Sequence, residues 1–229
     1  MKNITLFLIW AMSTSLLPVK AQNYWDITYQ TARSANPNWN QSIRFFNESR
    51  FWQEKPLSPL EWSRGGSVCY SGVLSRGFFI SPQLTYADLK AEGSAARITL
   101  RNYSAQIGID VYPFEFQLDS VAYLLRPFVR FTGGGDLYKP SILLANAPAT
   151  YMDQPYKPYC WAYRLESALG LRVRVTDVLG IHILGGYRFS KVYLENFHTT
   201  LNGVTSSIQS DTEKINAFVL QAGITIRIH

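Results

Sequence analysis

Residues 218–228 alternate between two kinds of side chain, and no other feature of the sequence constrains the fold as strongly. One side carries Phe218, Leu220, Ala222, Ile224, Ile226 and Ile228, and the other carries Val219, Gln221, Gly223, Thr225 and Arg227. A period of two places successive side chains on opposite faces of an extended chain. The segment is therefore predicted to be a β-strand with one continuous apolar face.

The same period recurs in six further segments, which are 66–74, 78–88, 103–111, 125–132, 161–174 and 180–192. Pro82 lies inside one of them and has no amide hydrogen to donate, so a bulge or a local break is expected there. A closed barrel with both ends on one side of the membrane needs an even number of strands. An eighth strand is therefore expected within residues 22–60.

Residues 22–60 allow two interpretations. Tyr24–Gln30 alternates weakly, as a strand would, whereas Trp39, Ile43, Phe46 and Arg50 have helical spacing. A short aromatic helix at 38–52 is therefore an equal alternative, either plugging the barrel or lying on the periplasmic interface. The choice between strand and helix stays open at this point.

The connections between the predicted strands differ in length in a regular way. Residues 75–77 and 175–179 are short, whereas 133–160 and 193–215 are long. Short periplasmic turns and long external loops are typical of bacterial outer-membrane barrels, whose alternating strands also keep mean hydropathy near zero. The sequence predicts an all-β, antiparallel up-and-down transmembrane β-barrel of eight strands, occupying residues 61–229 after an N-terminal helix or extension at 22–60.

The first residues predict export. Lys2 is followed by an apolar run from Ile4 to Leu17, and the small residue Ala21 stands two positions after Val19, which is typical of a signal peptide cleaved after residue 21. Removing residues 1–21 lowers the formal charge from +6 to 20 − 16 = +4. This mild charge, spread over single arginines, argues against a nucleic-acid partner. We expect the chain in the outer membrane of a Gram-negative bacterium.

Several short motifs strengthen this interpretation, namely Gly66-Ser67-Val68-Cys69-Tyr70, Gly77-Phe78-Phe79-Ile80-Ser81-Pro82, Arg126-Pro127-Phe128 and Gly185-Gly186-Tyr187-Arg188. Together with the last strand they resemble the small outer-membrane β-barrel proteins with an OmpA-like transmembrane domain, over about residues 62–228. The resemblance implies the barrel fold, whereas function is not shared across such families. Members usually end on an aromatic residue, but here His229 follows Ile228.

If the apolar faces meet lipid, the opposite faces place a set of charged side chains in the lumen. The set comprises Asp110, Arg126, Arg130, Arg164, Glu166, Arg188 and Arg227. Eight-stranded barrels have room for side chains and little else, so we interpret the set as ion pairs and hydrogen bonds that fill the interior. An anion-selective pathway or an anionic-ligand site is the alternative, because arginines outnumber acids. Arg172 and Arg174 also lie on the inward face of their strand, but they are close to a turn, where water would solvate them.

Cys69 and Cys160 are the only cysteines, and both have inward parity. An exported chain passes through an oxidising space, so a disulfide is permitted. The strands that carry them are well separated in the predicted order, however, and a bridge requires a close Cα approach. Both outcomes stay open. Since no histidine lies at a metal-site spacing from them, we expect neither a metal nor another cofactor.

Aromatic side chains near the N-terminus and in 133–160 are candidates for contact with a protein partner. They are Trp39, Phe46, Trp52, Tyr138, Tyr151, Tyr156 and Tyr159. The tyrosines would equally suit the aromatic belt that anchors barrels at the lipid headgroups. Partner contact and anchoring are both consistent with the sequence.

The expected function is a structural role, or that of an accessory subunit, in a larger outer-membrane complex for secretion or barrel assembly, without enzymatic activity. The expected partners are outer-membrane lipid, a protein in that membrane and, during biogenesis, the barrel-assembly machinery. A small channel or ligand-binding barrel is one alternative. A lipid-modifying enzyme that uses His198, Glu195 and Ser206 or Ser207 is another, although no nucleophile motif surrounds these serines.

Overall fold

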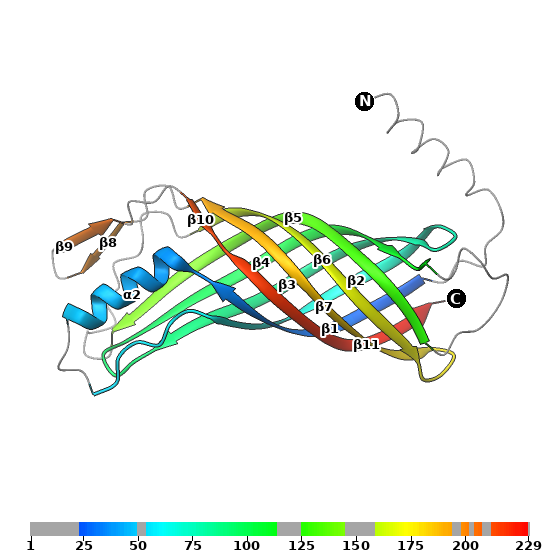
Figure 1. The fold of residues 1–229 in the computed structure, drawn as a ribbon, viewed down its shortest axis with the longest axis horizontal. Helices are drawn as coiled ribbons and strands as arrows, with labels where there is room; N and C mark the ends of the chain where they lie inside the picture. The colour runs from blue at the N-terminus through cyan, green and yellow to red at the C-terminus, as the bar shows by residue number, and fades with distance from the viewer. Residues whose placement is uncertain are drawn as a thin grey trace, which may run out of the picture.

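Eight long antiparallel strands close on themselves in the computed structural model (Figure 1), which describes residues 23–49, 54–113, 125–144, 159–193, 198–201, 204–207 and 212–228. The strands are β1 (Asn23–Ala35), β2 (Trp62–Ser75), β3 (Phe78–Glu92), β4 (Ala96–Val111), β5 (Leu125–Leu144), β6 (Cys160–Arg174), β7 (Leu179–Tyr193) and β11 (Asn216–Ile228). Each pairs with the next along the chain, and β11 pairs with β1. The predicted antiparallel barrel of eight strands is confirmed. The predicted signal peptide lies outside the described residues.

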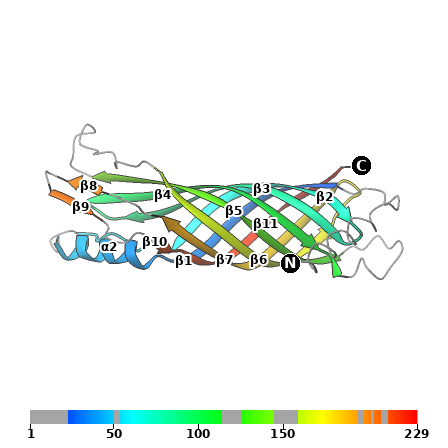
Figure 2. The same ribbon diagram turned by 90° about the horizontal axis from the view of Figure 1, so that it is seen from above.

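The N-terminal segment contains both of the expected elements. β1 pairs with β11 from Asn23↔Ile228 to Ala35↔Asn216, and the helix α2 (Pro37–Ser49) follows directly. The barrel wall thus takes its eighth strand from the segment before residue 61. In Figures 1 and 2, β1 begins and β11 ends at one end of the barrel, while α2 lies at the other. We name these the turn end and the loop end. The helix therefore lies at the end of the barrel opposite the start of β1 and the end of β11.

The sequence around α2 explains where it begins and how it is held. Pro37 suits the first helical turn, because it lacks an N–H that would have no partner there. The Asn40 side chain accepts a hydrogen bond from the Leu60 N–H at 2.8 Å, and the Asn47 side chain accepts one from the Leu57 N–H at 2.9 Å. These contacts tie the helix to the segment that leads into β2.

Strand β5 is longer than the sequence indicated. It continues through Gly133–Gly135 to Leu144, so the loop predicted at 133–160 begins only after residue 144. The first three residues of the predicted loop, Gly133–Gly135, thus belong to the strand. At Gly134 an added Cβ would lie 2.2 Å from the carbonyl oxygen of Ala105 on β4. Glycine is required here by the close approach of two strands, not by a turn.

Three shorter strands lie within residues 193–215. The strands β8 (His198–Leu201) and β9 (Val204–Ser207) form a hairpin that lies beyond the barrel wall at the loop end (Figure 2). The strand β10 (Thr212–Lys214) pairs with the end of β7. The ladder of β2 and β3 is interrupted beside Pro82, where the pairs step from Cys69↔Gln83 to Gly72↔Ile80 without a change of register. This agrees with the local break expected there.

The wall has apolar side chains outside and polar side chains inside. Outward residues such as Ile107, Leu169, Ile183 and Leu220 are more than half exposed. The buried inward set is mostly polar and includes Thr28, Gln30, Ser67, Gln83, Thr85, Ser104, Gln106, Thr132, Gln221 and Thr225. A water-soluble barrel has the opposite polarity, whereas lipid favours this one. The fold is therefore a transmembrane β-barrel. No helix among the described residues is long and apolar enough to cross a membrane.

Candidate functional site

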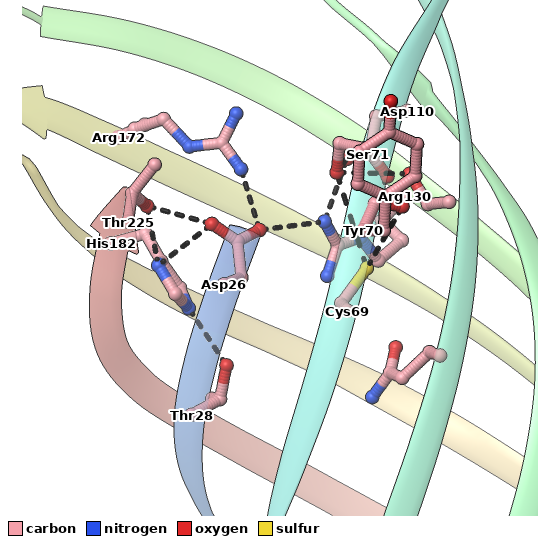
Figure 3. Close-up of polar contacts among 12 residues, drawn as sticks. Asp26, Thr28, Cys69, Tyr70, Ser71, Asp110, Arg130, Arg172, His182 and Thr225 are labelled. Carbon is pink, nitrogen blue, oxygen red and sulfur yellow. Dashed lines mark hydrogen bonds and ion pairs between the residues drawn. The ribbon is translucent and has the colours of Figure 1, made fainter. Parts of the chain in front are cut away.

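Asp26 is the centre of a buried charge cluster near the turn end (Figure 3). Its Oδ2 accepts hydrogen bonds from Arg172 at 2.6 Å and from Arg130 at 3.3 Å. Arg130 also donates two bonds of 2.6 Å to the two carboxylate oxygens of Asp110. A bidentate arginine–carboxylate pair is among the strongest hydrogen-bonded contacts in proteins. The four side chains join β1, β4, β5 and β6 across the lumen.

A chain of hydrogen bonds extends from Asp26 through His182. The Thr225 hydroxyl donates to Asp26 Oδ1 at 2.7 Å and lies 2.9 Å from His182 Nδ1. Since that hydroxyl hydrogen is used, His182 Nδ1 must donate to it, and His182 Nε2 then accepts from Thr28 at 3.0 Å. For a neutral imidazole, this network places the hydrogen on Nδ1.

A hydroxyl, an imidazole and a carboxylate in this order are also the groups of a catalytic triad. Thr28, His182 and Asp26 are, however, at most 4% exposed. Among the described residues, the Thr28 hydroxyl is buried beside the paired charges. We interpret Thr28, His182 and Thr225 as polar groups that satisfy one another in the interior.

A second charge cluster lies nearer the loop end. Arg188 donates to Glu166 Oε2 at 2.9 Å, and Gln221 donates to Glu166 Oε1 at 2.9 Å. The guanidinium of Arg164 lies 3.1 Å from the Asp136 carboxylate. Arg164 also donates to Ser104 and Asn102. Charges removed from water in this way require partners, and every arginine in the cluster has one.

The two clusters balance in charge. The acids Asp26, Asp110, Asp136 and Glu166 match the arginines Arg130, Arg164, Arg172 and Arg188, all at most 7% exposed. The surplus of arginine on which the anion-pathway alternative depended is absent among these buried residues. Ion pairs cross the middle of the lumen.

Aromatic side chains close the turn end below the Asp26 cluster. The rings of Tyr112 and Phe128 stack with centroids 5.2 Å apart, and Phe79 packs edge-on against Tyr112 at 5.0 Å. The Arg126 guanidinium lies 4.7 Å above the Tyr112 ring and contacts the Tyr24 hydroxyl. These side chains form an aromatic layer across the barrel.

Apolar side chains close the loop end in the same manner. Trp39 and Ile43 of α2 pack into a buried cluster with Leu60, Leu89, Leu100, Tyr138, Cys160, Val192 and Ile215. The helical spacing that predicted α2 is therefore the spacing of its buried face. The helix packs this face against the side chains at the loop end.

Several predicted site residues lie elsewhere. Arg227 is half-buried at the turn end, and its Nε has no hydrogen-bond partner among the described residues. No disulfide joins Cys69 to Cys160. Cys160 belongs to the loop-end cluster, whereas Cys69 pairs with Asp26 in the wall near the other cluster. The two cysteines are therefore at different depths of the barrel.

The residues predicted to contact a partner fall into three groups. Trp39 and Tyr138 are 4% and 3% exposed, so they are interior residues and not contacts. Phe46 packs against the loop-end cluster, and Tyr159 is exposed at the start of β6. Trp52, Tyr151 and Tyr156 lie outside the described residues. On α2 the exposed aromatic side chain is Phe45, at 59%.

Four buried residues of the lumen are absent from the set of lumen charges predicted from the sequence. One of the four, Arg172, was expected to be solvated. Asp26 lies on β1, for which the sequence allows strand or helix, and Asp136 lies within residues 133–160, which the sequence predicts as a loop. The alternation in β7 places His182 on the inward face, but a neutral histidine was not counted among the charged lumen residues. Arg172, expected near water, is 3% exposed because Tyr112 and Phe128 cover it from the turn end.

The barrel is similar to solved outer-membrane proteins of low sequence identity. The outer membrane protein OprG from Pseudomonas aeruginosa has 9% identity and a TM-score of 0.48, with 91% of this chain and 96% of that chain covered. Neisserial surface protein A has 11% identity and a TM-score of 0.45, with 90% and 97% covered. The attachment invasion locus protein Ail of Yersinia pestis was solved in complex with the heparin analogue sucrose octasulfate. It has 11% identity and a TM-score of 0.45, with 90% of this chain and 98% of that chain covered.

No protein-family model matches the chain, and no curated protein matches it. Identities near one in ten and TM-scores below 0.5 transfer neither a family nor a function. The resemblance to proteins with an OmpA-like domain therefore stays a prediction.

Proposed function

We propose that the chain is a non-conducting outer-membrane barrel that acts as a structural or accessory subunit of a larger outer-membrane complex. The observation that carries this proposal is the filled lumen. Between the aromatic layer at the turn end and the α2 cluster at the loop end lie four acids paired with four arginines. A barrel with such an interior anchors the protein in the membrane. Its contacts with a partner would then be made by surfaces outside the lumen.

The exposed face of α2 is the best candidate for contact with a protein partner. Phe45 is 59% exposed, and its helix neighbours Arg44 and Glu48 are exposed and charged. Aromatic side chains surrounded by polar groups are typical centres of protein interfaces. Because Trp39 and Ile43 fix the opposite face of the helix, Phe45 is presented on a rigid element. Secretion and barrel assembly are the kinds of complex that we expect.

The alternatives have less support. A channel needs an open path, which the two closed ends do not provide. The lipid-modifying alternative gains one observation, since the backbone of His198 pairs with that of Ser207 in the β8–β9 hairpin. Glu195 lies outside the described residues. Strand pairing by itself assigns no chemistry to these residues.

Photo-crosslinking from position 45 tests the subunit role. With a benzophenone side chain replacing Phe45, we expect one protein adduct of defined mass in native membranes, approaching one partner per barrel. The matched control places the same group at Leu169, which is 70% exposed on the lipid face. It should give no protein adduct. A position-45 variant that inserts normally but crosslinks no more protein than the Leu169 control would contradict the proposal.

A further inference from the structure

A ring of basic side chains surrounds the outside of the barrel near the loop end. Its members face outward from β1, β2, β3, β4, β5, β7 and β10, and we name them the basic ring: Arg33, Arg64, Lys90, Arg101, Lys139, Lys191 and Lys214. Charge on the lipid face of a transmembrane barrel is costly at mid-depth and tolerated only near the interfaces. The ring therefore marks one interface.

Aromatic contacts place the basic ring at the depth of the lipid headgroups. Arg33 lies over the Trp62 ring at 5.9 Å, Lys139 over the Tyr159 ring at 5.6 Å and Lys191 over the Tyr193 ring at 5.4 Å. Outward tyrosines and tryptophans gather where hydrocarbon meets headgroups. Cations stacked on that belt are held beside the headgroups and not in bulk water.

The strand register sets like charges opposite one another in this ring. Arg101 on β4 pairs directly with Lys139 on β5, and Lys191 on β7 pairs directly with Lys214 on β10. Like charges directly opposite each other destabilise a sheet. An anion held between the two cations of a pair would turn that repulsion into attraction.

The few acids in this region lie next to ring members on β1, β2, β3 and β4. Glu61 lies 3.7 Å from Arg33, and Asp88 is the register partner of both Arg64 and Arg101. Lys139, Lys191 and Lys214 have no acid in these contacts. Asp88 lies 3.1 Å from Lys90, and Glu92 lies 3.0 Å from Arg97. On the turn-end half, the outward positions of the described strands carry no charged side chain. Examples there are Trp25, Ile80, Ile109, Ile181 and Ile224. The basic surface thus belongs to one leaflet only.

We propose that the basic ring binds the phosphate groups of an anionic lipid in the outer leaflet. One phosphate lies between Arg101 and Lys139, and another lies between Lys191 and Lys214. Phosphate oxygens accept the several N–H donors that arginine and lysine present. The acyl chains then lie on the apolar face toward the turn end, where Tyr103 and Ile107 follow Arg101 in the same outward row of β4. This site is independent of the partner contact at Phe45.

Lipid A, a bisphosphorylated glycolipid, is a suitable probe for the folded full-length barrel in neutral detergent. Native mass spectrometry would measure how much lipid A stays bound. We expect Arg101→Gln/Lys139→Gln to weaken binding by about tenfold or more, since each cation near a headgroup contributes on the order of 1 kcal/mol. The matched control, Arg97→Gln/Arg174→Gln, removes the same charge from two arginines that already pair with Glu92 and Asp177.

The control variant should bind lipid A within about twofold of wild type. Enzymatically dephosphorylated lipid A should bind the wild type no better than it binds Arg101→Gln/Lys139→Gln. Equal binding by wild type and Arg101→Gln/Lys139→Gln would overturn the proposal. Equal weakening in both double variants would also overturn it, because net charge alone would then govern binding. Undiminished binding of the dephosphorylated lipid would overturn it too, since acyl-chain adhesion would then suffice.

Discussion

Asp26→Asn is expected to lower the free energy of unfolding of the barrel by about 3–5 kcal/mol, the usual cost of breaking a buried ion pair by removing one partner. Asparagine keeps the size of the side chain but removes the charge that faces Arg172 and Arg130. It also places an amide donor where Asp26 now accepts bonds from Thr225 and the two arginines. Two buried cations would then share one carboxylate, that of Asp110.

Urea unfolding in lipid vesicles, followed by the change in gel migration between folded and unfolded barrel, measures this loss. Asp88→Asn is the matched control, because it makes the same chemical change at a partly exposed ion pair with Lys90. Asp88→Asn should lower the free energy of unfolding by about 1 kcal/mol or less. An Asp26 variant no less stable than the Asp88 variant would show that the interior charges are not paired as described.

The stability of the loop end is expected to fall as pH rises from about 4.5 to about 7, because of Glu213. Its Oε1 accepts hydrogen bonds from the backbone N–H groups of Asn38 and Trp39 at the start of α2, at 3.1 and 3.4 Å. Burial beside Trp39 and Val192, beyond the basic ring, outweighs these bonds and raises the pKa of Glu213 from 4.5 to about 7.

The direction of the effect follows from proton binding. Between pH 4.5 and 7 the folded chain holds a proton on Glu213 that the unfolded chain has lost, so stability is full below this window and decreases through it. A shift of this size corresponds to about 3 kcal/mol as an upper bound. Hydrogen exchange of the α2 amides, corrected for the intrinsic pH dependence, measures the opening of the helix. In Glu213→Gln, which keeps the acceptor oxygen, the pH dependence should disappear. A dependence unchanged in that variant would refute the assignment to Glu213.

Much of the fold follows from one local rule. Successive side chains of a strand face outward and inward in turn, so β2 to β7 and β11 can be located from residues a few positions apart. The short strands β8, β9 and β10 lie in the segment that the sequence predicts as a long loop. β1 was ambiguous because its polar inward side and its short outward run make the alternation weak. The glycines of β5 do not mark a loop. At Gly134 glycine is required by Ala105 and Gln106 of a neighbouring strand, more than 25 residues away in sequence.

The sequence predicts which charged side chains face the lumen, but it does not predict which of them form ion pairs. Parity placed Asp110, Arg130, Arg164, Glu166 and Arg188 inside. Their partners depend on which strands lie across the lumen, and that depends on closure of β1 against β11. Asp26 illustrates this, since its contacts with Arg130 and Arg172 span 104 and 146 residues. The burial of Trp39 and Tyr138 was missed for the same reason, because only the assembled loop end shows what covers them.

Conductance of the folded barrel in a planar lipid bilayer tests the closed lumen most directly. Insertion of the protein would be verified by heat-modifiable migration of the same sample on a gel. The structure predicts a current that stays at the baseline of the empty bilayer under an applied potential, because paired charges and two apolar layers fill the barrel. Stable current steps that scale with the amount of folded protein, and that prefer anions over cations, would contradict it.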